Sequence, residues 1–491
     1  MEIILAGYNL DYETIKTMQA AFPEMNNLTP ETVSAAYARI SRNPLPVSEL
    51  RKIAREEIEK ARKSNRSIVF DMGHSSIAEH AVFNIDVIGV SRFIVEEIEK
   101  FRLCSYTEKS QRYIRLDGDF VIPEEIEAAN MKRLYVEIIE RQNRLYRELY
   151  SPLRVHVFEK HPEMAEIASN RSTLEGWAKE DARYIISLAA ETQLGMTVNA
   201  RNLELMLRRC AAHPLKEVNQ FGNRLYNATK NIAPSLVRYT DATPYDVHTR
   251  SDLRGISSGM VRKYEHDRMK DEPPIMKDHN VTLLYATPDA DDRVVASLIH
   301  SSSSLSMADC TSLVKRLSMK EKKDIIMTAC RRMQSYDSPL REFELVDLHF
   351  EIVVSASCFA QLKRHRMATV VCQEYDPELG VTIPHAVREI GIDRPFLDTV
   401  RQTEDVYCRL KEAAPSAAGY ILTNAHRKRI TMKVNARELY HISRLREDRH
   451  AQWDIRETAA RMVRLGKKVM PLTLMLATGK DTFAALYNEL F

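Results

Sequence analysis

Residues 100–113 read KFRLCSYTEKSQRY and residues 364–377 read RHRMATVVCQEYDP, and the two stretches align as altered copies of one segment. The first copy ends on a Glu-x-Ser-x-Arg-Tyr pattern that the second has lost. The second begins with an Arg-His-Arg triplet, where the first has Lys100-Phe101-Arg102. Because each copy keeps what the other has lost, two halves of the chain are expected to contribute different groups to one site.

Other landmarks recur along the chain at a nearly fixed spacing. The Asn-Ala-Arg triplet at 199–201 recurs at 435–437, 236 positions later, whereas Arg102 and Arg366 lie 264 positions apart. The second copy is therefore shorter by about 28 residues between its two motif blocks. Internal repeats of this kind predict a duplicated domain. We expect domain 1 over residues 1–245, a linker rich in charge, Pro, Gly and Ser over residues 246–279, and domain 2 over residues 280–491.

The composition is that of a globular protein with more than one domain. The chain has 491 residues, of which 44% are apolar and 28% charged. Its net charge of +3 is small for this length and does not by itself indicate nucleic-acid binding. Seven scattered cysteines without a Cys-x-x-Cys pair argue against a disulfide scaffold or a zinc ribbon. Residues 1–6 read as a first strand and not as a signal peptide, and no apolar run suits a membrane span, so we expect a cytoplasmic protein.

The hydrophobic spacing predicts more helices than strands, in no regular alternation. We expect a strand over residues 81–90, followed by a helix from Ser91 to about Arg102 with Ser91 as its N-cap. Residues 280–298 repeat the strand-then-helix pattern of residues 1–18, and residues 180–231 read as almost wholly helical. No Gly-x-Gly-x-x-Gly or P-loop pattern occurs. These features favour an α+β fold over a doubly wound sheet.

The end of the first copy has residue types that suit a phosphate. In an extended segment a spacing of two puts Glu108, Ser110 and Arg112 on one side. A guanidinium donates a planar fork and a hydroxyl donates one hydrogen, which together match phosphate oxygens. The alternative from spacing alone is a polar edge strand with an internal Glu–Arg pair.

The second copy has cationic groups at the expected end of a helix that begins near Ser355. Arg364, His365 and Arg366 suit an anionic or flat aromatic ligand such as a pyrophosphate or the edge of a flavin ring. The alternative is that they only satisfy a helix C-terminus.

A third block begins at Asn435. On a helix, Arg437 and His441 share a face, and Arg446 lies one turn before His450. A solvated helix face is the alternative reading. The neighbouring apolar residues, such as Leu439, weaken that alternative because they indicate packing.

Two further groups of residues give weaker indications of a functional role. The run from His74 to His80 includes Glu79, but no other ligand follows at a spacing typical of a metal site, so we predict no metal site. Cys104 and Cys372 have no base nearby in the sequence, so burial is expected and not a nucleophilic role.

Taken together and in order, these blocks resemble the flavin-dependent thymidylate synthases, the ThyX family, whose signature is RHRxxSxNExSxRY. The resemblance rests on His74-Ser75-Ser76-Ile77-Ala78-Glu79-His80, on residues 105–113, on Arg364-His365-Arg366, and on the run from Asn435 to Arg456. It spans most of both halves, so the chain resembles two fused, divergent copies. The resemblance implies two domains, each a mainly antiparallel sheet with long helices.

The resemblance also implies an activity and its participants. The family carries FAD, which NADPH reduces, and passes a methylene from methylenetetrahydrofolate to dUMP without a cysteine nucleophile. Its members are homotetramers with active sites at subunit interfaces, so a fused chain is expected to form a homodimer that acts as a pseudo-tetramer. The expected partners are therefore dUMP and folate, and neither a membrane nor a nucleic acid.

Family roles carry over residue by residue. The expected catalytic residues are Gln361 and Arg446. The positions expected to bind the nucleotide substrate are Glu108, Ser110, Arg112, Arg183, Gln361, Arg364 and Arg446. The positions expected to bind the flavin are Ser76, Glu79, Arg364, His365, Arg366, Asn435, Arg437, His441 and His450.

The resemblance has departures, which give the main hypothesis and its alternatives. Thr107 and His441 stand where the family has Asn, and Thr369 stands where it has Ser. The second copy has Cys372, Glu374 and Asp376 at the phosphate positions, with Gly419 or a near neighbour in place of Arg183. We expect a composite site, with phosphate groups from the first half and flavin and base groups from the second. The alternatives are a non-catalytic, regulatory nucleotide-binding paralogue and a flavin-dependent C1 transferase acting on another pyrimidine.

Overall fold

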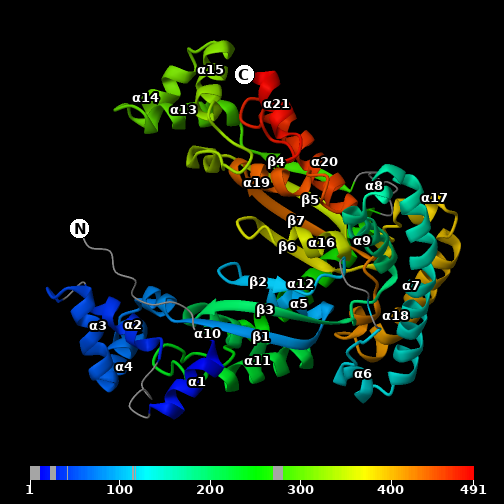
Figure 1. Cartoon of the computed structure of the whole chain (residues 1–491), viewed down its shortest axis with the longest axis horizontal. Helices are drawn as coiled ribbons and strands as arrows, with labels where there is room; N and C mark the ends of the chain where they lie inside the picture. The colour runs from blue at the N-terminus through cyan, green and yellow to red at the C-terminus, as the bar shows by residue number, and fades with distance from the viewer. Residues whose placement is uncertain (1–10, 23–28, 41–42, 113–115, 117, 269–279) are drawn as a thin grey trace. The chain divides into compact units, whose positions relative to one another are not determined.

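The computed structural model describes residues 11–22, 29–40, 43–112, 116, 118–268 and 280–491 (Figure 1). It divides into two compact units. Unit 1 comprises Met1–Lys109, Val121–Ala128 and Glu191–Pro274, and unit 2 comprises Ser110–Phe120, Ala129–Ala190 and Ile275–Phe491. Unit 2 thus contains a large part of the first half of the sequence. The expected first strand at residues 1–6, and Tyr113 of the first motif, lie outside the described residues.

Unit 1 is built on a three-stranded antiparallel sheet of order β1-β3-β2. The strands are β1 (Val82–Ser91), β2 (Ser105–Glu108) and β3 (Glu191–Asn199). Helix α10 (Ala200–Ala211) follows β3 and packs on α11 (Lys216–Thr229). The other α-helices described in this unit are α1 (Tyr12–Ala21), α2 (Glu31–Arg39), α3 (Val47–Glu56), α4 (Ile58–Arg66), α5 (Arg92–Ile98), α6 (Glu124–Ala128) and α12 (Pro244–Arg268).

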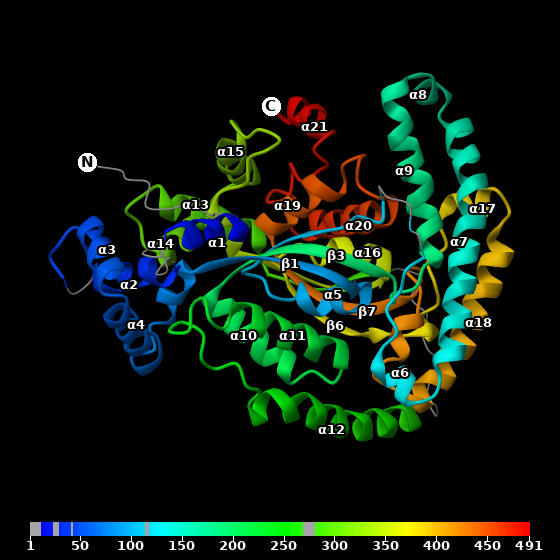
Figure 2. The same ribbon diagram turned by 60° about the horizontal axis from the view of Figure 1, so that its bottom comes forward.

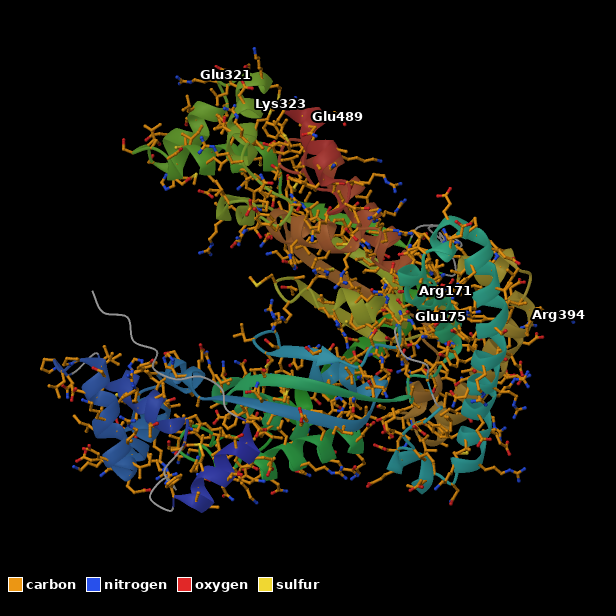
Figure 3. All side chains as sticks on the ribbon, in the orientation of Figure 1. Arg171, Glu175, Glu321, Lys323, Arg394 and Glu489 are labelled. Carbon is orange, nitrogen blue, oxygen red and sulfur yellow. The ribbon has the colours of Figure 1, made fainter. Side chains whose placement is uncertain are left out.

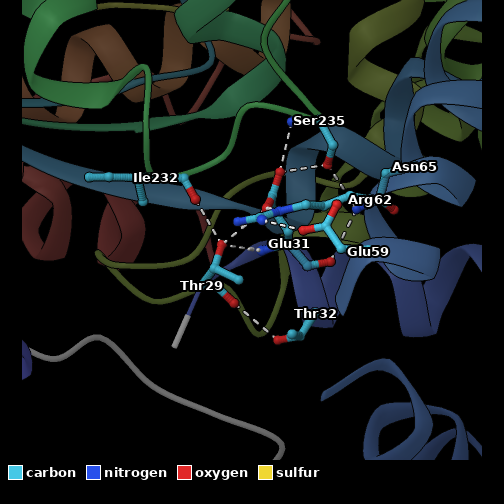
Figure 4. A network of polar contacts seen from close by, with 8 residues as sticks. All are labelled: Thr29, Glu31, Thr32, Glu59, Arg62, Asn65, Ile232 and Ser235. Carbon is cyan, nitrogen blue, oxygen red and sulfur yellow. Dashed lines mark hydrogen bonds and ion pairs between the residues drawn. The ribbon is translucent and has the colours of Figure 1, made fainter. Parts of the chain in front are cut away.

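A buried carboxylate joins two parts of unit 1 that are distant in sequence (Figure 4). Glu31, at the start of α2, is fully buried. Its Oε1 accepts hydrogen bonds from Ser235 N at 2.7 Å and Ser235 Oγ at 2.6 Å, and its Oε2 accepts one from Arg62 Nε at 2.7 Å. The side chain of Glu31 therefore ties α2 and α4 to the segment after α11.

Unit 2 is built on a four-stranded antiparallel sheet of order β4-β5-β7-β6. Its strands are β4 (Val281–Ala286), β5 (Asp347–Ser355), β6 (Thr369–Tyr375) and β7 (Arg427–Asn435). Inward residues of these strands, such as Phe350 and Met432, form the core with residues of the helices at Ala436–Arg446 and Trp453–Val469. The other α-helices described around this sheet are α13 (Ala290–Ser301), α14 (Met307–Val314), α15 (Met319–Cys330), α16 (Ala356–Leu362), α19 (Ala436–Arg446), α20 (Trp453–Val469) and α21 (Phe483–Leu490).

Long helices from both sequence halves pack together at one end of unit 2 (Figures 1 and 2). Helix α7 (Lys132–Lys160) contacts α9 (Arg171–Ala182) and also α18 (Asp393–Ala413) of the second half. The buried Gln142 on α7 donates to Thr403 Oγ1 on α18 and to the carbonyl of Ile421, both at 2.9 Å. Two short helices also belong to this group of helices, α8 (Pro162–Glu166) and α17 (His385–Glu389).

The segments after α9 and α18 pair with one another in an approximately symmetric way. Leu188 N donates to the carbonyl of Leu422 at 2.8 Å, and Asn424 N donates to the carbonyl of Ile186 at 2.9 Å. The bridge between them joins Ser187 to Thr423, which are equivalent residues 236 positions apart. Equivalent residues that face each other indicate a local two-fold relation between these two segments.

The pairing of β2 with β3 recurs in the pairing of β6 with β7, and the helix caps recur as well. Ser105 pairs with Thr197 in unit 1, as Thr369 pairs with Lys433 in unit 2. Ser91 and Ser355 cap α5 and α16, as Asn199 and Asn435 cap α10 and α19, each through its side-chain oxygen. Strand β1 also has a bulge between Ile88 and Val90, where Gly89 has φ +75°, a conformation that favours glycine.

The α+β prediction is confirmed, as are the strand before Ser91 and the capping role of that serine. Helix α5 ends at Ile98, before the expected Arg102. The almost wholly helical reading of residues 180–231 is wrong because β3, the central strand of its sheet, lies within it. Residues 246–268 of the expected linker belong to α12, while 269–279 are outside the described residues.

The surface has charges of both signs, as the small net charge predicts. On α15, for example, Glu321 and Lys323 are both exposed (Figure 3). Within the described part of the chain, every helix is too short or too polar to cross a bilayer.

Candidate functional site

Arg183 is the deepest arginine of the candidate site, in the short turn that follows α9. Only 6% of it is exposed, and its Nη2 donates to Ser357 Oγ on α16 at 2.7 Å. Its Nε has no hydrogen-bond partner among the described residues, nor does Nε2 of the buried Gln111. The carbonyl of Arg183 and the side-chain oxygen of Gln111 both accept from Asn424. Buried donors without partners indicate a place for an acceptor such as an anion.

Arg112 lies in unit 2 as well and joins the first repeat to the second. Its Nε pairs with the carboxylate of Glu180, and its Nη2 donates to the carbonyl of His450 at 3.1 Å. The hydroxyl of Ser110 accepts from the backbone N–H of Arg112 at 3.2 Å. Burial raises the pKa of Glu180, although the nearby charges of Arg112 and Arg183 oppose that shift.

Gln361 lies on α16, at the start of a buried chain of polar groups. Its Nε2 donates to Gln452 Oε1 at 3.3 Å, and Gln452 Nε2 donates to the hydroxyl of Tyr184 at 2.8 Å. The Tyr184 hydroxyl donates in turn to Asp454 Oδ2 at 2.9 Å, which also accepts from Ser355 Oγ at 2.5 Å. Tyr184 comes from the first repeat and the other residues come from the second. This series of hydrogen bonds therefore holds the Gln361 side chain in place with a group from each repeat.

Arg446 ends α19 and points toward α16. Its Nε donates to Nε2 of His365 at 2.9 Å, and its Nη2 donates to the carbonyl of Gln361 at 3.2 Å. Burial, together with the charges of Arg364 and Arg112, lowers the pKa of Arg446 to about 10. Burial is the larger cause, and the contributions of the two arginines indicate positive charges close to Arg446, which a bound anion would stabilise.

The residues around the Arg-His-Arg triplet differ in their exposure. His365 is buried, whereas Arg364, Arg366 and His441 are exposed, and the His441 ring lies 5.6 Å from that of His365. Met367 is 72% exposed beside them. The triplet follows α16, as expected, and its two exposed arginines are followed by the exposed side chain of Met367.

The remaining residues of the third block have partners within the protein. Asn435 Oδ1 accepts from Glu438 N at the start of α19. Arg437 donates to Glu344 at 2.8 Å and to the carbonyl of Pro339 at 2.7 Å. Because α19 ends at Arg446, the expectation of a helix that continues to His450 is wrong, and His450 follows in a turn where its Nδ1 contacts Asp448 at 2.7 Å.

Three residues with expected site roles belong to unit 1. Strand β2 ends at Glu108, so the expected alternation does not extend to Ser110 and Arg112, and Glu108 pairs instead with the buried Arg92. Ser76 lines a cavity of 570 Å³ together with His74, His80 and Tyr37. Glu79 pairs with Arg201 at 2.5 Å.

The first-repeat counterparts of Gln361 and Arg446 are engaged in ion pairs. Glu97, at the Gln361 position, contacts Lys100 and lies 3.4 Å from His213. Burial opposes ionisation, but these two partners lower the pKa of Glu97 to about 2. Arg209, at the Arg446 position, donates to the buried Asp246 at 2.9 Å.

The second-repeat counterparts of the phosphate positions are acidic or small. Glu374 on β6 pairs with Lys411 at 3.1 Å, and Asp376 caps the following turn by accepting from Glu378 N at 3.0 Å. Gly419 stands 236 positions after Arg183 and has no side chain to offer. This set lacks the cations that a phosphate requires.

Sequence reasoning did not single out several of these residues. Gln111 is next to Arg112, and Tyr184 recurs as Tyr420 at the repeat spacing, so both had a signal in the sequence. Glu438, which faces His365, and Ser357, which faces Arg183, could be found only from the fold. No group of three or more His, Cys, Asp or Glu side chains that could hold a metal occurs among the described residues.

Comparisons with known proteins agree with the repeat. The Thy1 family model, described as thymidylate synthase complementing protein, matches residues 25–235 and 282–472. A flavin-dependent thymidylate synthase of Clostridium tetani is 32% identical over 216 residues, which cover 43% of this chain and 82% of that protein. A UPF0159 protein of Thermoplasma acidophilum is 23% identical over 480 residues, covering 89% of this chain and 93% of that protein.

Among solved structures, the UMP/dUMP methylase PolB from Streptomyces cacaoi, bound with 5-Br dUMP, aligns with a TM-score of 0.33 and 19% identity, over 42% of this chain and 94% of that one. The family model covers well over half of the chain and matches it in both repeats. The chain therefore belongs to the Thy1 (ThyX) family and has two copies of its domain.

Proposed function

We propose that this protein is a flavin-dependent methylase that converts dUMP to dTMP, with methylenetetrahydrofolate as the methylene donor and NADPH as the reductant. One observation carries the proposal. Arg112 and Arg183 of the first repeat lie in the same compact unit as Gln361 and Arg446 of the second. Groups from both repeats thus lie in unit 2, which supports a composite site, whereas Glu108 of the first motif lies in unit 1.

The phosphate of the nucleotide is proposed to bind to the groups from the first repeat. Arg183 Nε and Gln111 Nε2 are buried donors without partners among the described residues. The hydroxyl of Ser110 can donate while it accepts from Arg112 N. A dianionic phosphate monoester would satisfy these donors and reduce the repulsion among the arginines.

The base of the nucleotide is proposed to bind to Gln361 and Arg446. Both side chains are held in place by neighbours, Gln361 through Gln452 and Arg446 through His365. Uracil presents carbonyl oxygens and an N–H group, which an amide and a guanidinium can match. Fixed donors of this kind orient a substrate before it reacts.

The flavin is proposed to bind along the second-repeat triplet, because the residues there fit such a group. Arg366 and His441 are exposed cationic or polar side chains, and Met367 offers an apolar surface beside them. A reduced flavin, when bound, would supply the hydride that the conversion needs. The neighbouring Cys358 is buried and burial raises its pKa well above the usual value, so we give it no role as a nucleophile.

The test is dTMP formation from dUMP by the purified full chain supplied with FAD, NADPH and methylenetetrahydrofolate. Arg446→Ala should lower turnover by at least about 100-fold, because it removes a group that orients the base. Arg209→Ala changes the equivalent residue of the first repeat and should leave turnover within a few-fold. Equal losses in the two variants, both of them folded, would contradict the composite site.

One observation favours a second candidate, a regulatory protein that binds the nucleotide without catalysis. Asn435 and Arg437, two expected flavin positions, already have internal partners. This alternative predicts that the protein binds dUMP but stays colourless after incubation with FAD. A yellow protein whose NADPH oxidation responds to UMP or another pyrimidine, but not to dUMP, would instead support a different substrate.

A further inference from the structure

His365 is a buried imidazole whose hydrogen-bond pattern fixes its tautomer. Its side chain is 1% exposed, and its Nε2 accepts from Arg446 Nε at 2.9 Å. A guanidinium can only donate, so Nε2 has no hydrogen and the ring proton lies on Nδ1. Burial, and then the charges of Arg446 and His441, lower the pKa of His365 well below its usual value, which keeps the ring neutral.

The Nδ1 of this ring faces one carboxylate. Glu438 Oε1 lies 3.3 Å from Nδ1, and Glu438 is only 7% exposed. The separation is longer than a standard hydrogen bond, and neither atom has a hydrogen-bond partner among the described residues. A small movement of either side chain would make this contact a hydrogen bond and satisfy both atoms.

We propose that Glu438 is a positioning residue that holds the Nδ1–H tautomer of His365, so that Nε2 stays available to orient the guanidinium of Arg446. The inference rests on the function proposed above. Glu438 acts only through His365 and is not placed in contact with the substrate. Glu438 orients His365, His365 orients Arg446, and Arg446 contacts the nucleotide.

The first repeat provides an internal comparison. Phe101 stands at the His365 position and Asn202 at the Glu438 position. Neither can take part in such a series, because the phenyl ring of Phe101 has no hydrogen-bonding atom and the side chain of Asn202 donates to Asn199 Oδ1 at 2.9 Å. Arg209 is directed instead to Asp246. The Glu–His–Arg series thus occurs in the repeat that keeps Gln361, and in the other repeat all of its supporting members are replaced.

The direct test is the tautomer of His365 in the unliganded protein. In a sample labelled with ¹⁵N-histidine, the nitrogen shifts distinguish a protonated Nδ1 from a protonated Nε2, and His365→Gln assigns the signal. Wild type should show the Nδ1–H form at pH 7. Glu438→Gln keeps an oxygen acceptor and should keep this tautomer, whereas Glu438→Leu removes the acceptor and should shift the ring to a mixture of tautomers.

Affinity for dUMP, measured without flavin, gives the second readout. Glu438→Leu should weaken binding about tenfold because the Arg446 guanidinium loses its fixed orientation, while Glu438→Gln should stay within about threefold of wild type. Glu447→Gln is the matched control, since Glu447 follows the same helix and pairs with Ser443, not with His365.

A wild-type His365 protonated on Nε2, or a folded Glu438→Leu variant with unchanged tautomer and affinity, would overturn the proposal. If Glu438→Leu does not fold, the wild-type spectrum still tests the proposal, because it shows which nitrogen of His365 is protonated. A wild type that binds no dUMP but shows the predicted dependence of the tautomer on Glu438 would refute the proposed function and leave the positioning of His365 intact.

Discussion

Asp181 shows how one buried carboxyl group makes the stability of this protein depend on pH. The residue lies near the end of α9, and its Oδ1 accepts from Trp453 Nε1 at 2.8 Å. Burial raises its pKa to about 7 from 3.8, against the opposing effect of the Trp453 hydrogen bond. The folded state therefore holds a proton that the unfolded chain releases near pH 4. The contribution of Asp181 to stability is highest below pH 4 and is lost as pH rises toward 7.

Asp181→Asn should remove this pH dependence while keeping the hydrogen bond, because an asparagine oxygen can also accept from Trp453. The melting temperature of the variant should equal that of wild type near pH 4 and exceed it at pH 8. Since a shift from 3.8 to about 7 is about three pKa units, the gain at pH 8 should be on the order of 4 kcal/mol. Thermal unfolding at the two pH values checks this. An equal difference between the proteins at both pH values would show that the carboxyl keeps its ordinary pKa.

At the scale of elements, the attachment of α2 and α4 to the segment around Ser235 depends on Glu31. Glu31→Ala should lower the free energy of unfolding of the protein by about 3 kcal/mol, because it leaves Arg62 and the donors of Ser235 without their buried acceptor. Glu59→Ala is the control, since Glu59 pairs with the same arginine but has a 77% exposed side chain. Denaturant unfolding compares the two, and a similar loss in both would contradict the importance of burial.

The elements that could be predicted from the sequence are those with a strong local signal. Ser91 and Ser355 mark helix starts because a serine oxygen satisfies the first free backbone N–H groups. Strand β3 escapes prediction because helical patterns flank it on both sides. Its signal is nevertheless present, since Thr192, Leu194, Met196 and Val198 alternate as buried residues. Helix α12 resembles a linker in sequence because most of its side chains are exposed, so no apolar face is evident in a polar stretch.

At the scale of the whole molecule, the repeat is visible in the sequence, but its consequences for contacts are not. Spacing alone locates the arginines of both copies. That Arg183 reaches Ser357, and that Tyr184 reaches Gln452, depends on the pairing of the two segments around Ser187 and Thr423. Sequence periodicity describes one element at a time, whereas these contacts join residues well over 100 positions apart. The complementary losses therefore suggest a composite site, but only the fold shows which side chains meet.

The duplication also leads to a prediction about the number of nucleotides bound per chain. Each complete site needs phosphate groups from one repeat and base groups from the other. In the first repeat, Glu97 stands at the position of Gln361, the proposed base-binding amide, and Arg209 is held by Asp246. In the second, Asp376 and Gly419 stand at the positions of Arg112 and Arg183, the arginines proposed to bind the phosphate. The proposed composite site therefore predicts that one set of groups binds dUMP and the other set does not.

Calorimetric titration of the full chain with dUMP should give one nucleotide per chain. Arg183→Ala should reduce the affinity at least about tenfold, because it removes a buried cation that the phosphate would pair with. Asp246→Ala releases Arg209 but should not create a second site, since the carboxylate of Glu97 still stands at the position of Gln361. Two equivalent nucleotides per chain in the wild type would show that the second set is also functional, and the division of labour between the repeats would then be wrong.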